Sequence, residues 1–257
     1  MKIKKKCILY STIFKFKYPE YRLSLILIIL NSLYGGLFWG SDIDGYFSTI
    51  FSVINCQSFN MFTLFIIIYN TIITFNIFNA NYSYIIRLKN KKQYLIELLK
   101  AICINNFLIL LFQWIFIFIV VLFSIKKSLG IEIIDNYDIN NCLYILFAFI
   151  KNITLIEIIG LYCGLLLTRL NKNVVIFIFS VFNISLLNEF SYSGYIIDSY
   201  SKMPLFYGSY LSINNYNSFI NEVHYSLVYI TMLFFVLYVL FNFFLFLNKR
   251  YHNDIHN

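Results

Sequence analysis

Six long apolar segments most constrain what this chain can fold into. A helix that crosses the roughly 30 Å hydrocarbon core of a bilayer needs about 20 apolar residues. Backbone groups in lipid must be paired within each segment, and a transmembrane barrel would show apolar and polar residues in alternation. The segments are too continuous for alternation, so they predict helices. They span residues 23–39, 59–78, 102–123, 143–167, 174–187 and 225–247, and the fifth is the shortest.

The composition agrees with a chain that lies mostly in lipid. Hydrophobic residues make up 60% and charged residues 12% of the sequence, whereas soluble domains average about 25% charged residues. We therefore expect an all-α membrane protein with a single transmembrane domain and no large soluble domain. Its parts are an interfacial cytosolic N-terminus (1–22), a six-span region (23–247) and a cytosolic tail (248–257).

The basic residues predict the orientation of the chain in the membrane. Of the 20 Lys and Arg residues, sixteen fall on the side that holds both termini, and only Lys126, Lys127 and Lys202 fall on the other, with Lys151 inside a span. Positive charge marks the cytosolic side. We therefore expect a multi-pass protein of the plasma membrane with both termini in the cytoplasm.

The N-terminal segment 1–22 has apolar residues at helical spacing between its lysines. This pattern favours an amphipathic helix on the inner leaflet, where basic residues attract anionic lipid. A frayed basic tail is the alternative. The residues that recur at this spacing are the apolar Ile8, Leu9, Ile13 and Phe16, together with Thr12.

Sequence motifs for catalysis or cofactor binding are absent. The chain has no Gly-x-Ser-x-Gly nucleophile motif and no phosphate-binding G-x-x-x-x-G-K-[ST] loop. Its five cysteines are scattered singly and bear no ligand-like spacing to the three histidines. We therefore expect no enzyme activity, metal or cofactor in this chain and no binding to nucleic acid; any ATP hydrolysis would occur in another subunit.

Two ionisable residues fall inside the fourth apolar segment. Charges at bilayer depth are costly and mark candidate functional sites. Lys151 and Glu157 are six residues apart, which places them about 9 Å apart along a helix axis and about 120° apart around it. A direct pair is therefore awkward, and each is expected to face another helix or a polar cavity. The alternative for Lys151 is a span that begins near it, so that its side chain reaches the outer surface.

Asparagines in the second segment are a weaker signal. Their amides can form hydrogen bonds between helices, and we favour this packing role over a substrate path. The residues are Asn60, Asn70, Asn76 and Asn79.

The outer connection between the fifth and sixth segments is rich in tyrosine. Aromatic residues of this kind prefer the membrane interface, so an interfacial aromatic belt is one interpretation. An outer gate or re-entrant hairpin over an exit path is the other. The gate candidates are Pro204, Phe206 and Tyr207.

Residues 84–100, "YIIRLKNKKQYLIELLK", form a basic stretch between the second and third segments. One short apolar stripe precedes Asn90, and a second with helical spacing continues into the third segment. Lys91 and Lys92 interrupt the stripes. The stretch predicts two short amphipathic pieces that meet near Asn90, an organisation that charges serving only topology would not need.

The layout resembles the membrane subunit of an ABC-2 type exporter. The shared features are six spans in about 250 residues, a basic amphipathic N-terminus, the basic loop 84–100 and an elaborated connection between spans five and six. The loop also resembles the R-x-K-x-x-x-x-aromatic pattern of small permeases for peptide export and bacteriocin or lantibiotic immunity in low-GC Gram-positive bacteria. In that family the loop forms a coupling helix that docks on an ATPase subunit. The resemblance implies a coupling role for Tyr84, Arg87, Lys89, Lys91, Lys92, Tyr94, Glu97 and Lys100.

The same resemblance implies the partners and the mechanism. Cytosolic ABC ATPase subunits would bind ATP and Mg²⁺, and a second permease subunit would complete the path in the membrane. An interior with few charges suits an amphipathic or hydrophobic cargo, such as an antimicrobial peptide, a peptide toxin or a lipid-like molecule. Two other classes remain open. One is an ion-coupled secondary transporter that uses Lys151 and Glu157, and the other is a membrane assembly protein that does not transport.

Overall fold

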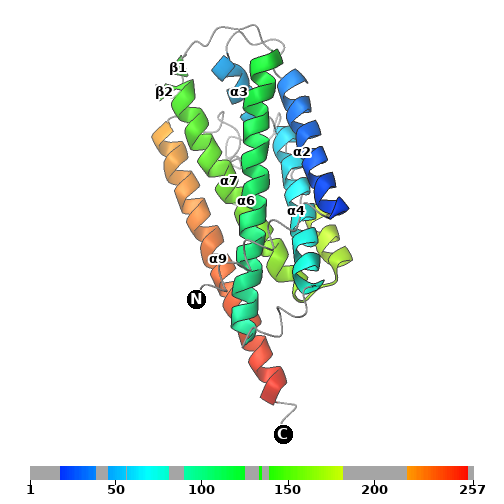
Figure 1. The fold of residues 1–257 in the computed structure, drawn as a ribbon. Coiled ribbons are helices and arrows are strands. Elements are labelled where there is room, and N and C mark those ends of the chain that lie inside the picture. Colours follow the sequence, from blue (N-terminus) through cyan, green and yellow to red (C-terminus); the bar gives the residue numbers. More distant parts are fainter. Residues whose placement is uncertain are drawn as a thin grey trace, which may run out of the picture.

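The computed structural model is a bundle of long helices (Figure 1). It describes residues 18–38, 46–55, 57–80, 90–124, 133–134, 139–181 and 219–253. The amphipathic N-terminal helix, the first half of the basic stretch and the candidate outer gate lie outside these ranges. The labelled helices are α2 (Pro19–Phe38), α3 (Tyr46–Asn55), α4 (Gln57–Ala80), α6 (Lys91–Ser124), α7 (Asn141–Leu167) and α9 (Phe219–Asn253).

Four described helical stretches are long and apolar enough to cross a membrane. They are Phe62–Ala80, Lys91–Phe123, Cys142–Leu167 and Phe219–Phe246, and they correspond to the second, third, fourth and sixth predicted segments. The first predicted segment forms α2, a helix of 20 residues with Glu20 in its first turn. The chain is thus a helical protein suited to several membrane crossings.

The first and the fifth predicted spans are not among these four stretches, and the fifth is the shorter. The described part of this segment is a ten-residue helix, Lys172–Val181, which is about 15 Å long at 1.5 Å per residue. Such a helix covers about half of the hydrocarbon core. Residues 182–187 lie outside the described part of the chain, so the count of six spans stays a prediction.

Two features of the connections were not predicted. Helix α3 (Tyr46–Asn55) occupies a region that the sequence assigns to an outer loop, and the Tyr46 hydroxyl donates a hydrogen bond to the Phe118 carbonyl of α6 at 3.0 Å. The short strands β1 (Ile133–Ile134) and β2 (Ile139–Asn140) pair antiparallel just before α7. Asn140 then caps α7, because its side chain accepts from the Leu143 N–H at 2.8 Å.

Helix α7 packs against α3, α4, α6 and α9. Glycine allows close packing against α6, because a Cβ at Gly160 would overlap Nδ2 of Asn106 and a Cβ at Gly164 would overlap Cδ1 of Ile102. A larger residue at either position would force the facing side chain to shift. Buried aliphatic and aromatic residues of the surrounding helices complete this core.

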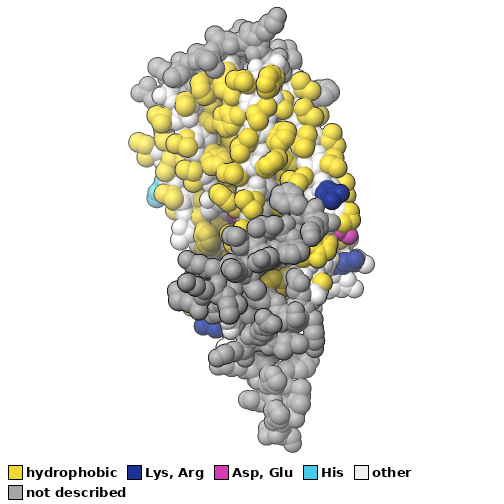
Figure 2. Space-filling model, in the orientation of Figure 1, with side chains coloured by type: hydrophobic (Ala, Val, Ile, Leu, Met, Phe, Trp, Pro, Cys, Tyr) yellow, Lys and Arg dark blue, Asp and Glu magenta, His cyan; other side chains and the backbone are white. Residues whose placement is uncertain are grey.

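The surface of the described bundle is largely apolar. Hydrophobic side chains cover most of the described surface in the upper half of Figure 2, and the visible Lys and Arg side chains lie below this region, from about mid-height downward. Many large aromatic and aliphatic side chains are exposed on α2, α6 and α9. A soluble protein rarely exposes so much contiguous apolar surface, so this surface fits contact with lipid.

Candidate functional site

A buried ion pair joins α7 to α9. The Lys151 ammonium donates to Oε1 of Glu222, and both side chains are almost fully buried, at 2% and 0% exposed. The Tyr144 hydroxyl donates to the same carboxylate oxygen at 3.1 Å. The Lys151 Nζ also lies 5.3 Å from the centroid of the Phe147 ring, within the range of a cation–π interaction. We call Tyr144, Lys151 and Glu222 the ion-pair cluster.

Helical spacing brings the cluster together. Tyr144, Phe147 and Lys151 follow one another at intervals of three and four residues, so they share one face of α7. Glu222 lies in the first turn of α9, where the helix dipole favours a negative charge. The ammonium of α7 and the carboxylate of α9 therefore neutralise each other inside the bundle.

The structure places Lys151 inside the bundle. The residue is 3% exposed and is the eleventh residue of one continuous helix that begins at Asn141, so its side chain does not reach the surface of the bundle. Where the membrane span begins along this helix stays a prediction. Lys151 faces another helix, as expected, and its partner is Glu222 and not Glu157.

Sequence reasoning missed Glu222. It was assigned to the outer connection, because the apolar segment was taken to begin at residue 225, whereas α9 begins at Phe219. A signal was present: Glu222, Ser226 and Tyr229 recur at intervals of four and three, and all three are buried. Extending the helical period back from the apolar segment would have placed Glu222 on the buried face.

Glu157 is buried without a described partner. The residue is 8% exposed, and within the described part of the chain neither carboxylate oxygen has a hydrogen-bond partner. It precedes Gly160 by about one turn on α7, and Gly160 lies against Asn106 and Thr71. A carboxylate in this setting is a hydrogen-bond acceptor without a described donor. The expected interior position of Glu157 is confirmed by its burial, and its role remains a prediction.

Polar side chains link α2, α4 and α6 inside the bundle. Asn106 accepts a hydrogen bond from Asn70 at 2.6 Å and donates to Thr71 at 3.0 Å. Thr63 accepts from both Gln113, at 2.6 Å, and Asn31, at 3.1 Å. The packing interpretation of the asparagines is thus confirmed for Asn70.

The other three asparagines of α4 differ in their surroundings. Asn60 is buried, Asn76 is exposed, and the Oδ1 atom of Asn79 accepts a hydrogen bond from the Tyr94 hydroxyl at 2.7 Å. The Tyr94 ring also packs edge to face against Phe78, with centroids 5.7 Å apart. The end of α4 is thereby fastened to the first turn of α6.

The second half of the basic stretch, residues 91–100, forms the N-terminal part of helix α6. Asn90 accepts a hydrogen bond from the Gln93 N–H at 2.8 Å and so caps α6. Lys91 and Lys92 are exposed, and Leu95 and Leu98 are buried. The predicted run of this amphipathic piece into the third span is confirmed, because α6 is continuous from Lys91 to Ser124.

The remaining candidate residues divide into two groups. Glu97 and Lys100 form an ion pair with 3.3 Å between Oε1 and Nζ, and the Lys100 side chain is exposed. The other candidates lie outside the described residues: Tyr84, Arg87, Lys89, Pro204, Phe206 and Tyr207. The structure therefore brings together Tyr94, Glu97 and the exposed lysines at the start of α6, and it separates them from the ion-pair cluster.

The described ranges show no candidate metal-binding site. No group of three or more His, Cys, Asp or Glu residues there is placed to hold a metal ion. The described cysteines are free: Cys103 and Cys142 are exposed and Cys163 is buried.

Comparison with protein-family models, with characterised proteins and with solved structures found no match to this chain.

Proposed function

We propose that the chain is the membrane-spanning permease subunit of an ATP-driven exporter of the ABC-2 type. It acts with a second permease subunit and with separate cytosolic ATPase subunits, and it moves an amphipathic or hydrophobic cargo out of the cell or out of the inner leaflet. The observation that carries the proposal is the start of α6, where two exposed lysines stand on a helix that continues without a break through the bundle.

Helix length supports this role. Helix α6 has 34 residues and is therefore about 51 Å long, whereas the hydrocarbon core is about 30 Å thick. About 20 Å of helix extends beyond the core. The exposed Lys91 and Lys92 at this end suit a groove of opposite charge on a partner, and force applied there acts on the whole helix as a rigid element.

The contact between α4 and α6 adds a second support. Tyr94 bonds to Asn79 and packs on Phe78, and the Asn70 and Asn106 amides bond to each other further along the same two helices. The two helices are thus fastened at their connected ends and again in the interior. Movement of the basic end of α6 would carry α4 with it, which is what a coupling element requires.

The test is purification of the tagged chain from its native membrane in mild detergent. We expect an ATPase subunit to accompany it, and we expect Lys89→Glu, Lys91→Glu and Lys92→Glu together to remove that subunit and the ATP hydrolysis of the sample. Lys172→Glu, a charge reversal on another exposed lysine of the same expected side, is the matched control and should retain both. An ATPase that stays bound to the triple variant, or no ATPase with the wild-type chain, would reject the proposal.

An ion-coupled secondary transporter is the second candidate, and Glu157 is the observation that favours it. A buried carboxylate without a described partner is the kind of group that carries protons or cations through a membrane protein. This candidate requires no ATPase. Transport by the purified chain alone in proteoliposomes, driven by a pH or sodium gradient, would support it over the exporter.

A further inference from the structure

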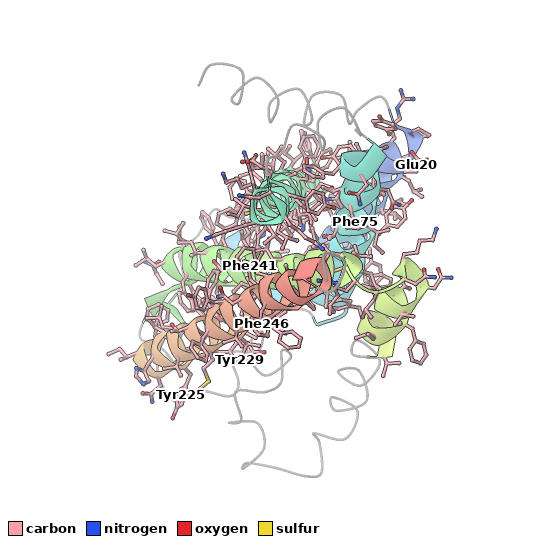
Figure 3. The ribbon with its side chains drawn as sticks, turned by 90° about the horizontal axis from the view of Figure 1, so that it is seen from below. Glu20, Phe75, Tyr225, Tyr229, Phe241 and Phe246 are labelled. Carbon is pink, nitrogen blue, oxygen red and sulfur yellow. The ribbon has the colours of Figure 1, made fainter. Side chains whose placement is uncertain are left out.

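Helix α9 is attached to the described bundle along one face. Among the labelled helices it packs mainly against α7, and in Figure 3 it lies beside α7 at the edge of the described helices, with α6 on the far side of α7. In its most apolar stretch only 11% of the residues are buried, against 61% on α7. Most of the surface of α9 is therefore left for lipid or for a partner.

The opposite side of α9 carries a stripe of exposed residues. The face attached to the bundle consists of buried and half-buried residues at helical spacing: Glu222, Ser226, Tyr229, Leu233, Leu240 and Phe244. Residues two positions apart on a helix lie about 200° apart around its axis, so positions two residues away from this face lie on the other side. We call five such exposed residues the outer stripe: Val228, Thr231, Phe235, Tyr238 and Asn242.

Helix α6 shows what a lipid-facing surface of this protein looks like. The amides of Asn105, Asn106 and Gln113 are buried, and the exposed side chains from Cys103 to Phe123 carry no amide or hydroxyl group. Such groups find no hydrogen-bond partner in hydrocarbon, which costs free energy. A helix face that meets only lipid is therefore expected to lack them.

The outer stripe of α9 differs from that surface. Thr231 lies near the middle of the candidate span Phe219–Phe246, and Tyr238 is 66% exposed. Asn242 is exposed and donates one amide hydrogen to the Tyr238 carbonyl at 2.8 Å. An amide has a second hydrogen and an acceptor oxygen, and in a membrane such groups form hydrogen bonds between helices. This face therefore suits another protein helix better than lipid.

The chemistry of the outer stripe favours a second copy of this chain. Two copies with the same orientation in a membrane are related by a twofold axis along the membrane normal, so their α9 helices run parallel and equal residues meet. Because an amide both donates and accepts, Asn242 can pair with the same residue of the second copy through reciprocal hydrogen bonds. The stripe holds no Asp, Glu, Lys or Arg, so it offers nothing to a partner recognised by charge.

The spacing of the outer stripe also suits a pair of parallel helices. Its residues follow one another at intervals of 3, 4, 3 and 4, which is the heptad spacing of a left-handed helix pair. A single Asn in such a seam fixes the register of the two helices. Asn242 is the one Asn of the stripe.

We propose that the outer stripe of α9 is the contact surface for a second copy of this chain, whose own α9 packs parallel to the first about a twofold axis along the membrane normal. The inference deepens the proposed function, on which it rests, by naming the second permease subunit as a second copy and by placing the contact on α9. In this arrangement α7 lies on the side of α9 away from the contact, so the two bundles flank a central helix pair.

Disulfide cross-linking of the full chain in membranes tests the contact. Each variant carries a single cysteine on a background in which the five natural cysteines are alanine, so a disulfide must join two molecules. Phe235→Cys lies on the outer stripe. Val236→Cys, the matched control, is exposed at nearly the same depth but points about 100° away. A disulfide needs Cα atoms about 4.4 to 6.8 Å apart, so we expect at least about fivefold more cross-linked dimer from Phe235→Cys.

Each other result of the cross-linking has a defined meaning. Equal amounts of dimer from the two variants would show random collision, and monomer alone would leave lipid on the outer stripe; either result would overturn the proposal. A disulfide between the Phe235→Cys variant and a different protein would replace the second copy with that protein.

Energy transfer between labelled chains tests the amide pair. Donor- and acceptor-labelled chains are mixed in liposomes, and added lipid dilutes them. Asn242→Leu should weaken their association about 3- to 30-fold, the range expected for a hydrogen bond between membrane helices. Asn76→Leu, at an exposed asparagine of α4, is the matched control and should leave association unchanged. Equal effects of the two substitutions, or no energy transfer with the wild-type chain, would contradict the contact.

These readouts separate the contact from the exporter. Neither of them needs an ATPase. A dimer through the outer stripe without a co-purified ATPase would reject the exporter and keep the contact. An ATPase that accompanies the chain, together with no dimer from Phe235→Cys, would reject only the contact.

Discussion

Lys151 and Glu222, 71 residues apart in the sequence, form an ion pair that is buried inside the bundle, out of contact with water. Removal of one partner from a buried pair leaves an uncompensated charge and costs about 3 to 5 kcal/mol, whereas replacement of both by neutral residues of similar size is often close to neutral. The same carboxylate oxygen also accepts from Tyr144. The pair is therefore the main polar attachment of the first turn of α9 to α7.

The first prediction follows from this asymmetry. Lys151→Met and Glu222→Gln should each destabilise the chain by about 3 to 5 kcal/mol, and the double variant should recover most of the loss. Thermal unfolding in detergent measures the effect. Glu97→Gln, in the exposed pair with Lys100, is the control and should change stability by about 0 to 1 kcal/mol. A double variant as unstable as the sum of the singles would contradict the pairing.

The second prediction concerns the glycines of α7. An added methyl group at Gly160 would meet the Asn106 amide, which is held by Thr71 and Asn70, whereas one at Gly164 would meet the flexible end of Ile102. Gly160→Ala should therefore cost about 1 to 3 kcal/mol, and Gly164→Ala should cost less. Chemical denaturation of the two variants in parallel decides the order. The reverse order would show that α6 and α7 pack differently.

The third prediction tests the fastening of α4 to α6. Tyr94→Phe keeps the ring on Phe78 and removes the hydrogen bond to Asn79. We expect a loss of about 1 kcal/mol and faster amide hydrogen exchange at the end of α4 and the start of α6. Exchange at α7 serves as the internal control and should not change. Unchanged exchange at all three places would mean that this bond does not hold the two ends together.

The long helices and the positions of many polar residues could be predicted from the sequence. Apolar runs are set by the thickness of the bilayer, so α4, α6 and α7 were placed to within about one to three turns. The burial of Glu157 was predicted from its position within one such run, whereas for Lys151 the sequence left a side chain at the outer surface as an alternative. These predictions depend on composition along a single segment, which a sequence displays directly.

Contacts between helices were harder to predict. Glu222 was missed because its neighbours 219–224 are not apolar enough to extend the sixth segment, and its partner Lys151 lies on another helix. Helix α3 was missed because ten residues are too few to signal a span, and its stability depends on packing against α6 and α7. Which face of α9 stays exposed likewise depends on its packing against α7, so the apolar segment alone does not predict it.

The fourth prediction tests the orientation of the bundle. Cys142 is exposed in the first turn of α7, at the expected outer end, and Lys92 is exposed at the expected cytosolic end. In a chain that keeps only Cys142, a membrane-impermeant maleimide should label intact cells. A chain that keeps only a cysteine introduced by Lys92→Cys should be labelled only after the membrane is permeabilised. The opposite pattern would reverse the predicted topology.

The fifth prediction uses Glu157 to separate the two transport mechanisms. Its carboxylate oxygens have no described partner, so Glu157→Gln removes an ionisable group without breaking a described hydrogen bond, and stability should change by less than about 1 kcal/mol. In an ATP-driven exporter whose cargo is apolar, this variant should retain cargo-stimulated ATP hydrolysis. In an ion-coupled transporter it should abolish flux driven by a pH gradient, because the group that carries the proton is lost. Measuring both activities on the same preparation shows which mechanism, if either, depends on Glu157. ATP hydrolysis that the variant retains, together with no gradient-driven flux in the wild-type chain, would favour the exporter.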